Sequence, residues 1–534
     1  MSKVFLLAVY TDGMMDMYEE LGICFISAYL RKFGHEVMLM AKKEEMCDYE
    51  KIIAFNPEFI GLPVYNVSKD AVYRVINNIR AELSGAYICV GGYLPTYRGK
   101  FMLEQNSQID FAIYGEGEET FRELCLKIES NEPLREVYGL IYREGNDVIV
   151  NKPRKLIEDL NTIPFPSRDL LVDNKLNIAQ LSSSRGCMSR CHFCASTLFW
   201  EKWRGKNSKS VVDEIEYIVN EYKINTFNFI DNSFEDSLGE YNRLYSIVKG
   251  IVERELKINY FADFRAEFHR KANAEIMQLL KESGLCGICL GVEAGNEEDL
   301  KLYGKIANIE DIENAIELFR KFGINVEPGF INFNPYSNFT GLRKNIGFLE
   351  RYGLASNNDY IVSKYKRYDG TYLSKKIQKD NLCGNEMSEE GYLFVNEDVG
   401  IFSEYIRNYS ISINSCTKNA LDKISFFSVK YHTLLNFIKR QCILNKKENS
   451  YNLVLEYEQK NREICADINK TVADWFRCLL DLAENKWDEN QANLISDHLF
   501  NKEYIEINAN SLEKCKVRLY KELMKDEIEI LRIY

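Results

Sequence analysis

"NIAQLSSSRGCMSRCHFCAS", residues 177–196, joins a short apolar run to three cysteines in the pattern C-x3-C-x2-C. Cys187, Cys191 and Cys194 lie within eight residues, and such close spacing requires a shared chemical reason. Three explanations compete: a zinc site, part of a disulfide framework, or a redox cluster that keeps one coordination position open. The sequence around the triplet decides how well each explanation fits.

The spacing of the cysteines favours the cluster without excluding zinc. Structural zinc takes four ligands, commonly as two close pairs, and here only Cys191 and Cys194 form a C-x2-C pair. The next close cysteines, Cys286 and Cys289, lie more than ninety residues further on, inside a predicted strand. A disulfide network would leave one of the three cysteines over. Three thiolates suit three irons of a cubane cluster, and the fourth iron stays open.

Strand and helix patterns alternate on both sides of the triplet. Short apolar runs are followed by helical periodicity from residue 177 to about residue 368, which predicts six strand–helix units and a partial parallel (β/α)6 barrel of the TIM type. In such barrels the chemistry collects at the carboxyl ends of the strands, and the triplet follows the first strand. The predicted strands are 177–187, 226–234, 259–268, 287–295, 325–335 and 359–368.

The first 150 residues show the same alternation in a separate block. Nearly continuous apolar runs are typical of strands in a parallel sheet covered on both faces, and helical stretches between them predict a doubly wound, Rossmann-like α/β domain. Ligands bind such sheets at the carboxyl ends of the strands. Three of those ends, "GLPVYN", "VGGYLPT" and "YGEGEET", contain glycine, which permits positive φ and close backbone approach to a ligand.

The remaining segments complete the expected domain organisation. Two prolines in "NTIPFPSRDLL" indicate a linker. Beyond about residue 380, helical periodicity rich in Tyr, Phe and Leu predicts a helical domain whose aromatic residues form its core. The expected domains are 1–150 (Rossmann-like), 151–175 (linker), 176–375 (barrel) and 376–534 (helical C-terminal domain).

Composition limits the class of protein. The 534 residues are 46% hydrophobic and 28% charged, which is typical of a soluble globular chain. The net charge of −12 gives no global attraction to nucleic acid or to anionic membranes. No apolar run is long enough for a transmembrane helix, and the N-terminus reads as a first strand rather than a signal peptide. Most of the 15 cysteines stand beside apolar residues, which predicts buried thiols in a reducing cytoplasm.

The triplet, with Phe193 before its last cysteine and a barrel strand before its first, resembles the radical S-adenosylmethionine superfamily. That resemblance implies a 4Fe–4S cluster on Cys187, Cys191 and Cys194, with S-adenosylmethionine on the open iron. "FIDNSF", "FADFRAEF", "GVEAG" and "GFINFNP" match the strand ends that carry cofactor contacts in the family. The residues implied to contact S-adenosylmethionine are Phe193, Asp231, Arg265 and Glu293.

The N-terminal block resembles the cobalamin-binding domain that precedes the barrel in one branch of this superfamily. The resemblance rests on residues 21–37, 90–96 and 109–121, and it weakens beyond 369–377. It implies cobalamin contacts at Pro63, Tyr65, Asn66, Gly91, Gly92, Tyr93, Gly115, Glu116 and Gly117. The D-x-H-x-x-G motif of other cobalamin proteins is missing, because Met17 and Glu19 stand at the corresponding positions. We therefore expect cobalamin without histidine ligation, and we expect His35 to be a surface residue.

The resemblance implies a cobalamin-dependent radical methyltransferase acting on an unactivated carbon of a peptide or small natural-product substrate, through a 5′-deoxyadenosyl radical and methylcobalamin. A cyclase, ring-contraction or rearrangement enzyme with no net methyl transfer is the alternative, and a cobalamin sensor with structural zinc is a distant third. The expected partners are the substrate and an electron donor such as flavodoxin or ferredoxin, with no nucleic acid and no membrane. We assign no catalytic residue from the sequence, and the helical C-terminal domain is a candidate cap over the substrate.

Overall fold

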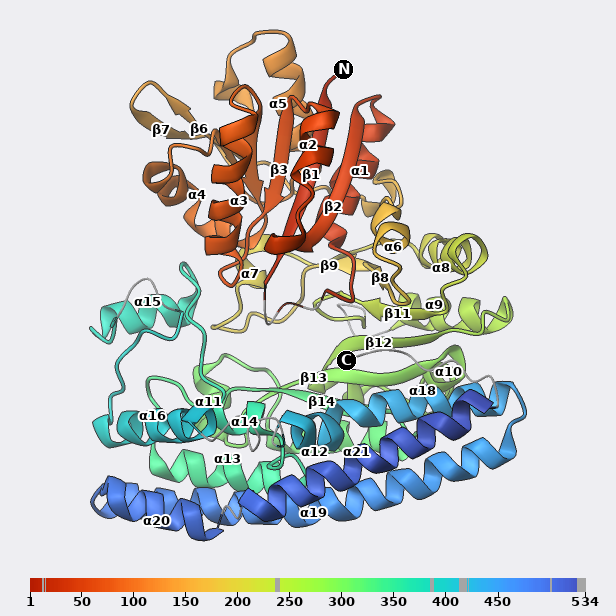
Figure 1. Ribbon diagram of the computed structural model, residues 1–534, viewed down its shortest axis with the longest axis vertical. Coiled ribbons are helices and arrows are strands. Elements are labelled where there is room, and N and C mark those ends of the chain that lie inside the picture. Colours follow the sequence, from red (N-terminus) through yellow and green to blue (C-terminus); the bar gives the residue numbers. More distant parts are fainter. Residues whose placement is uncertain are drawn as a thin grey trace. The chain divides into compact units, whose positions relative to one another are not determined.

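The computed structural model describes residues 1–11, 14, 16–235, 241–384, 389–412, 420, 422–499 and 502–525 (Figure 1). The chain forms two compact units, Met1–Cys187 with Ser196–Asn232, and Met188–Ala195 with Ser233–Tyr534. Residues 238–240 of one predicted helix, and the chain after residue 525, lie outside the described residues. No helix of the described residues is long and apolar enough to cross a membrane.

The first unit contains a seven-stranded sheet in the order β2-β1-β3-β4-β5-β6-β7. Neighbouring strands from β2 to β5 are parallel, and β6 and β7 add an antiparallel hairpin at one edge. The order 2-1-3-4-5 is a doubly wound topology, so the Rossmann-like prediction is confirmed. The strands are β1 (Lys3–Tyr10), β2 (Glu36–Lys43), β3 (Phe59–Pro63), β4 (Tyr87–Gly91), β5 (Phe111–Ile113), β6 (Leu140–Glu144) and β7 (Asp147–Val150).

Helices cover both faces of this sheet, which explains why its strands are apolar on both sides. Apolar residues of α1 and α5 share one buried cluster with the sheet, and those of α2, α3 and α4 share a second cluster (Figure 1). The helices are α1 (Leu21–Lys32), α2 (Tyr49–Phe55), α3 (Lys69–Glu82), α4 (Tyr93–Gln105) and α5 (Glu118–Glu129), and short 3-10 turns are η1 (Glu44–Met46) and η2 (Leu134–Glu136).

Two local expectations in this unit are wrong. His35 is 6% exposed, and its Nδ1 accepts a hydrogen bond from the Ser2 N–H at 3.2 Å, so it is a buried rather than a surface residue. Gly61 lies inside β3 and not in the turn that follows it. A Cβ there would come within 2.7 Å of Leu6 and 3.1 Å of Phe121, so close packing rather than positive φ requires this glycine.

The expected linker is packed against the doubly wound sheet. Leu160, Ile163 and Leu170 belong to the same buried cluster as α1. Beyond it, β8 pairs in parallel with β11, and the two-residue strands β9 and β10 pair antiparallel. The elements are η3 (Leu160–Thr162), α6 (Asp169–Asp173), β8 (Ala179–Leu181), β9 (Ser184–Arg185), α7 (Ser196–Trp200), β10 (Arg204–Gly205), α8 (Ser208–Tyr222) and β11 (Thr226–Phe229).

The second unit continues the strand–helix alternation. β12 pairs in parallel with β13, and β13 with β14, so these three predicted barrel strands are confirmed. The predicted strand at 359–368 is wrong, because Asn358–Val362 is the helix α14 and only Lys364 forms an isolated bridge, to Phe333. The elements are α9 (Asn242–Glu253), β12 (Asn259–Arg265), η4 (Ala266–Arg270), α10 (Ala274–Ser283), β13 (Leu285–Glu293), α11 (Glu297–Leu302), α12 (Ile309–Lys321), β14 (Asn325–Phe330), α13 (Phe339–Arg351) and α14.

The C-terminal region is helical, as expected, and its aromatic residues form a core. Trp475, Tyr431 and Phe476 are almost completely buried. The 38-residue α19 packs against α13, α16, α18, α20 and α21 (Figure 1). The helices are α15 (Tyr372–Lys379), α16 (Glu397–Ser412), η5 (Phe426–Lys430), α18 (Tyr431–Leu444), α19 (Glu448–Asn485), α20 (Glu489–Leu499) and α21 (Lys502–Lys525).

Helix α18 contacts the amino ends of the barrel strands. Asn436 Nδ2 donates to the carbonyl oxygens of Cys286 and Gly323, at 3.0 and 2.9 Å. Near the start of β13, a Cβ at Gly287 would come within 2.5 Å of Thr433, so a glycine is needed for α18 to approach this closely. Because chemistry in barrels collects at the carboxyl ends, α18 closes the end opposite to the expected substrate site.

Candidate functional site

Three turns of the first unit meet at the carboxyl ends of β3, β4 and β5. Pro63 pairs with Gly91 across the two strands, and the Val64 N–H donates to the Gly91 carbonyl at 2.9 Å. Gly92 is the N-cap of α4 with φ 92°, and Gly115 follows β5 with φ 76°, and only glycine adopts such values easily. A Cβ at Gly115 would meet nothing within 4 Å, so the backbone is open there. The structure therefore brings the predicted cobalamin turns together.

Aromatic hydroxyls of two of these turns are hydrogen-bonded inside the unit. The Tyr65 hydroxyl donates to the Glu20 carboxylate, and burial raises the pKa of Glu20. Tyr93 accepts a hydrogen bond from Trp200 Nε1 at 3.3 Å. Asn66 lies in the same turn as Tyr65. Glu19, at one of the positions that replace the missing histidine motif, is bound by Arg168, so its carboxylate belongs to a buried ion pair.

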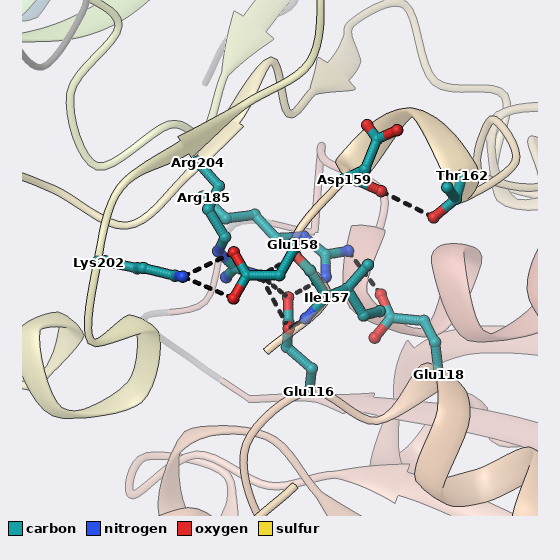
Figure 2. Close-up of polar contacts among 9 residues, drawn as sticks. All are labelled: Glu116, Glu118, Ile157, Glu158, Asp159, Thr162, Arg185, Lys202 and Arg204. Atoms are coloured by element: carbon teal, nitrogen blue, oxygen red, sulfur yellow. Dashed lines mark hydrogen bonds and ion pairs between the residues drawn. The ribbon is translucent and has the colours of Figure 1, made fainter. Parts of the chain in front are cut away.

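The third turn carries a buried charge cluster (Figure 2). Glu116 accepts from Arg185 Nη1 at 2.6 Å and from Arg204 Nη1 at 3.0 Å, and its carboxylate also accepts the Ile157 N–H at 2.7 Å. Burial alone would raise the pKa of Glu116, but the two guanidinium groups hold it below its usual range. Gly117 then precedes α5. The predicted site residue Glu116 thus has its side chain engaged within the protein.

Asp231 shapes the segment that leads to the first cysteine. The residue is 1% exposed, and its carboxylate accepts hydrogen bonds from the hydroxyls of Ser183 and Ser184, both at 2.9 Å. It also accepts the backbone N–H groups of the same two serines. These four hydrogen bonds hold residues 183–184 at the end of β11, so the structure gives Asp231 a positioning role just before Cys187.

In the second unit, the other half of the cysteine loop is held by backbone contacts. The His192 N–H donates to the Tyr303 carbonyl and its Nδ1 contacts the Leu302 carbonyl, both at 2.8 Å. The Leu373 N–H of α15 donates to the His192 carbonyl at 2.9 Å. The Phe193 ring meets Tyr303 edge-on, with centroids 5.5 Å apart. These contacts hold the loop against α11 and α15.

The donor set fits an iron–sulfur cluster by its chemistry. Cys187, Cys191 and Cys194 are reduced thiols, and each side chain is partly exposed. Among the described residues, no three Cys, His, Asp or Glu side chains are already gathered around one metal position. Three thiolates on one short loop are the ligands such clusters require. His192, between two of them, contacts the Leu302 carbonyl through Nδ1 and packs its ring against Tyr372.

Two predicted residues of the barrel face the same side of its sheet. Arg265, at the end of β12, donates from its Nε to Glu235 at 2.7 Å, and Glu235 is completely buried. Glu293 ends β13, and its carboxylate lies 3.8 Å from Lys305 Nζ. A Cβ at Gly329 of β14 would come within 3.4 Å of that carboxylate. A side chain at Gly329 would therefore stand in ordinary van der Waals contact with Glu293.

Glu293 also has an unusual backbone. Its φ of 70° is uncommon for a residue other than glycine, and such strained positions cluster at functional sites. Burial raises the pKa of Glu293, and the nearby Lys305 offsets this only in part. A buried, strained carboxylate at a strand end is available for a cationic or hydroxyl-bearing ligand.

Sequence reasoning missed several residues that position these sites. Glu235 lies four residues after Asp231 and directly follows the predicted strand 226–234, so its position next to a strand end was a signal that could have been used. Arg185 precedes the triplet by two residues, but nothing in the neighbouring sequence indicates that it binds Glu116, 69 residues away. The other missed residues are Glu20, Ser183, Ser184, Arg204 and Lys305.

Comparison with known families agrees with both halves of this picture. Residues 16–125 match the B12 binding domain family, and residues 181–337 match the radical SAM superfamily. Together these two matches cover half of the chain. The first contains all the predicted cobalamin turns, and the second contains the cysteine triplet and Glu293. The fold and its sites thus define a radical SAM protein with a B12-binding domain.

Individual relatives support the same assignment. The chain is 28% identical over 321 residues to an uncharacterized methyltransferase of Pyrococcus horikoshii, covering 58% of this chain and 68% of that protein. It is 27% identical over 317 residues to an anaerobic magnesium-protoporphyrin IX monomethyl ester cyclase of Synechocystis, covering 57% of this chain and 62% of that protein. The chain therefore spans about two thirds of the length of each.

A solved structure shares the complete fold. OxsB, a cobalamin-dependent S-adenosylmethionine radical enzyme with aqua-cobalamin and S-adenosylmethionine bound, matches 99% of this chain and 82% of its own, with a TM-score of 0.71 and 21% identity. By its two family matches, the chain belongs to the cobalamin-dependent radical S-adenosylmethionine enzymes: the radical SAM domain implies a 4Fe–4S cluster and S-adenosylmethionine, and the B12 binding domain implies cobalamin.

Proposed function

We propose that this protein is a methyltransferase that methylates an unactivated carbon of a peptide or small natural-product substrate. The bound cofactors supply reductive cleavage of S-adenosylmethionine and a carried methyl group, and the protein binds, orients and shields them. An electron donor such as flavodoxin or ferredoxin supplies the electron. The similarity to the uncharacterized methyltransferase of Pyrococcus horikoshii supports methyl transfer.

The residues have separate tasks in this proposal. Cys187, Cys191 and Cys194 hold the cluster, and Asp231 positions the segment that enters their loop through Ser183 and Ser184. Phe193, Arg265 and Glu293 contact S-adenosylmethionine or the residues around it, with Arg265 oriented by Glu235. Asp231, which the resemblance implies as a further contact of S-adenosylmethionine, stays part of that proposed binding site.

Cobalamin lies, in this proposal, over the three turns at the ends of β3, β4 and β5. The open backbone at Gly115 and the positive φ of Gly92 suit close approach of a large flat ligand. Pro63, Tyr65, Asn66, Gly91, Tyr93, Glu116 and Gly117 line the same turns. Glu116 takes part through its backbone, because its carboxylate is bound by arginines.

One observation carries the proposal that both cofactors serve one reaction. The turn that begins α5 is ion-paired to the strand that enters the cysteine loop, through Glu116 and Arg185 (Figure 2). Two independent binding modules would not need this buried connection.

Methyl-deuterated S-adenosylmethionine tests the reaction. With the anaerobically reconstituted protein, a reducing system and a candidate peptide or natural-product extract, we expect a product that carries the deuterated methyl group. Mass spectrometry of the product and of 5′-deoxyadenosine makes the measurement. A product without label, formed together with 5′-deoxyadenosine, would refute methyl transfer.

That second outcome would identify a cyclase, ring-contraction or rearrangement enzyme. The similarity to the Synechocystis cyclase favours this alternative. Both reactions use the same three cofactors, and the isotope separates them because only methylation transfers the labelled group.

We expect Glu293→Gln to weaken binding of S-adenosylmethionine about tenfold or more, because a buried charged acceptor is lost. In the wild-type protein, the affinity should fall as the pH is lowered toward the raised pKa of Glu293, since only the ionised carboxylate attracts the sulfonium and it accepts more strongly from hydroxyls than the protonated form does. The Gln variant should lack this dependence. Equilibrium dialysis of the cluster-loaded protein between pH 5 and 8 measures both.

The exposed Glu297→Gln, at the start of the next helix, is the matched control and should bind as the wild type does. Equal affinity of the wild type and Glu293→Gln at every pH would contradict the role of Glu293.

A further inference from the structure

Arg185 connects two sites that lie far apart in the sequence. Its Nη1 donates to Glu116 at 2.6 Å and its Nη2 to Glu118 at 2.5 Å, so one guanidinium holds both carboxylates of the "GEGE" turn (Figure 2). Arg185 itself lies in β9, two residues before Cys187. All of these groups belong to the first compact unit, apart from the cysteines that follow Cys187.

The ion pairs between Arg185 and the two glutamates are buried. The side chains of Arg185, Glu116 and Glu118 are 8%, 3% and 5% exposed. The guanidinium also packs against Phe25 of α1 and Trp200 of α7, with centroid distances of 5.1 and 5.4 Å. The planar guanidinium of Arg185 is bound by two carboxylates and packed against two aromatic rings, so it has little freedom to change position.

Arg204 is a second arginine bound by Glu116. It pairs with Arg185 directly across the β9–β10 ladder, where two like charges repel each other. Glu116 lies between them and accepts from both, and Arg204 also donates to the Ile157 carbonyl at 2.6 Å. Because Glu116 binds both arginines and Glu118 binds Arg185, a shift of the turn moves the negative charges on which the strand pair depends.

We propose that Arg185 is a positioning residue that couples the two cofactor sites: cobalamin at the Gly115–Gly117 turn orders the strand that enters the cysteine loop, and the loaded loop in turn favours cobalamin. The inference rests on the cobalamin position proposed above but not on methyl transfer. Coupling of this kind is reciprocal, so each ligand changes the affinity of the other by the same factor.

Hydrogen–deuterium exchange of the full-length, iron-free protein tests the first half. On saturation with hydroxocobalamin, the amides of residues 182–187 should exchange at least about fivefold more slowly in the wild type. In Arg185→Gln they should keep their cobalamin-free rates, while the turns at 63–66, 91–93 and 115–117 are still protected. Lys202→Ala is the matched control, because Lys202 forms an ion pair with the exposed Glu158, next to the buried charges of Glu116 and Arg204, and its loss should leave the response unchanged.

Each outcome decides between the proposals. Protection of the three turns without protection of residues 182–187 in the wild type would overturn the coupling and leave the cobalamin position intact. Equal protection of residues 182–187 in wild type and Arg185→Gln would overturn the role of Arg185. If cobalamin binds and protects none of the three turns, the proposed cobalamin position fails first and the coupling fails with it.

The second half is measured as affinity. The dissociation constant of hydroxocobalamin should differ about fivefold or more between iron-free and cluster-loaded wild type, and less than about twofold in Arg185→Gln. Glu118→Gln weakens one of the two ion pairs of Arg185 and leaves the pair with Glu116 in place, so this variant replaces Arg185→Gln in the experiment if Arg185→Gln does not fold. An unchanged difference in both variants would refute the inference.

Discussion

A protein in which Cys187, Cys191 and Cys194 are all replaced by alanine is expected to lose its bound iron and at least about a thousandfold of its cleavage of S-adenosylmethionine. The three thiolates are the ligands available to hold the cluster, and without it no electron reaches the sulfonium. Iron content after anaerobic reconstitution and 5′-deoxyadenosine formed on reduction measure the two losses. The visible spectrum should still show bound cobalamin, because its proposed turns lie elsewhere.

The control is Cys286→Ala, which removes a buried thiol of β13 outside the loop. It should keep about four irons per chain, the number in a 4Fe–4S cluster, and should cleave at the wild-type rate. Robust cleavage by the triple variant would contradict the assignment of the cluster. Zinc in place of iron in the anaerobically purified wild type would instead support a structural site at the triplet.

The second large effect concerns stability. Arg168→Met should lower the free energy of unfolding by about 3 to 5 kcal/mol, because it leaves buried carboxylates without their cation. Arg168 donates to Glu19 and, at 2.7 Å, to Glu214, and all three side chains are at most 2% exposed. The thermal midpoint of the cofactor-free protein should fall by about 3 to 5 °C, because the entropy of unfolding of a 534-residue chain is about 1.1 kcal/mol/K. Differential scanning calorimetry makes the measurement.

Two further variants test whether the loss of stability in Arg168→Met comes from unpaired buried charge. Arg31→Met removes a partly exposed arginine that pairs with Asp169, next to Arg168 in the sequence, and should cost about 1 kcal/mol or less. Adding Glu19→Leu to Arg168→Met should recover much of the loss, since Glu214 keeps Lys206 at 2.9 Å as its partner. A loss in Arg168→Met no larger than that in Arg31→Met would show that the ion pair adds little.

Much of the fold could be predicted because its signals are local. The apolar runs of β1 to β5 and the helical periods between them are readable within about ten residues, and they indicate a sheet covered on both faces. The triplet at Cys187, Cys191 and Cys194 is likewise a spacing within one loop. Strand-end glycines at Gly92 and Gly115 were readable for the same reason, since their φ is a local property.

The segment after β14 marks where local patterns failed. The run "DYIVSKYKRY" alternates in a way that suits a strand, yet Asn358–Val362 is helical because Asn357 caps it, accepting the Asp359 N–H at 2.9 Å. Helix α18 shows the same limit at longer range. Its period predicts a helix, but only the contacts of Thr433 and Asn436 place it at the amino ends of β13 and β14.

The sequence by itself determined most of the elements and the order of the two cofactor domains, and it predicts the cluster ligands, because each depends on residues close together in the chain. Only the tertiary structure decided how buried charge is neutralised. Arg185 and Glu116 lie 69 residues apart, and Arg168 and Glu19 lie 149 apart. A charge is buried at a cost that only its partner offsets, and that partner is chosen by the fold rather than by spacing. The link between the "GEGE" turn and the cysteine loop therefore became visible only in three dimensions.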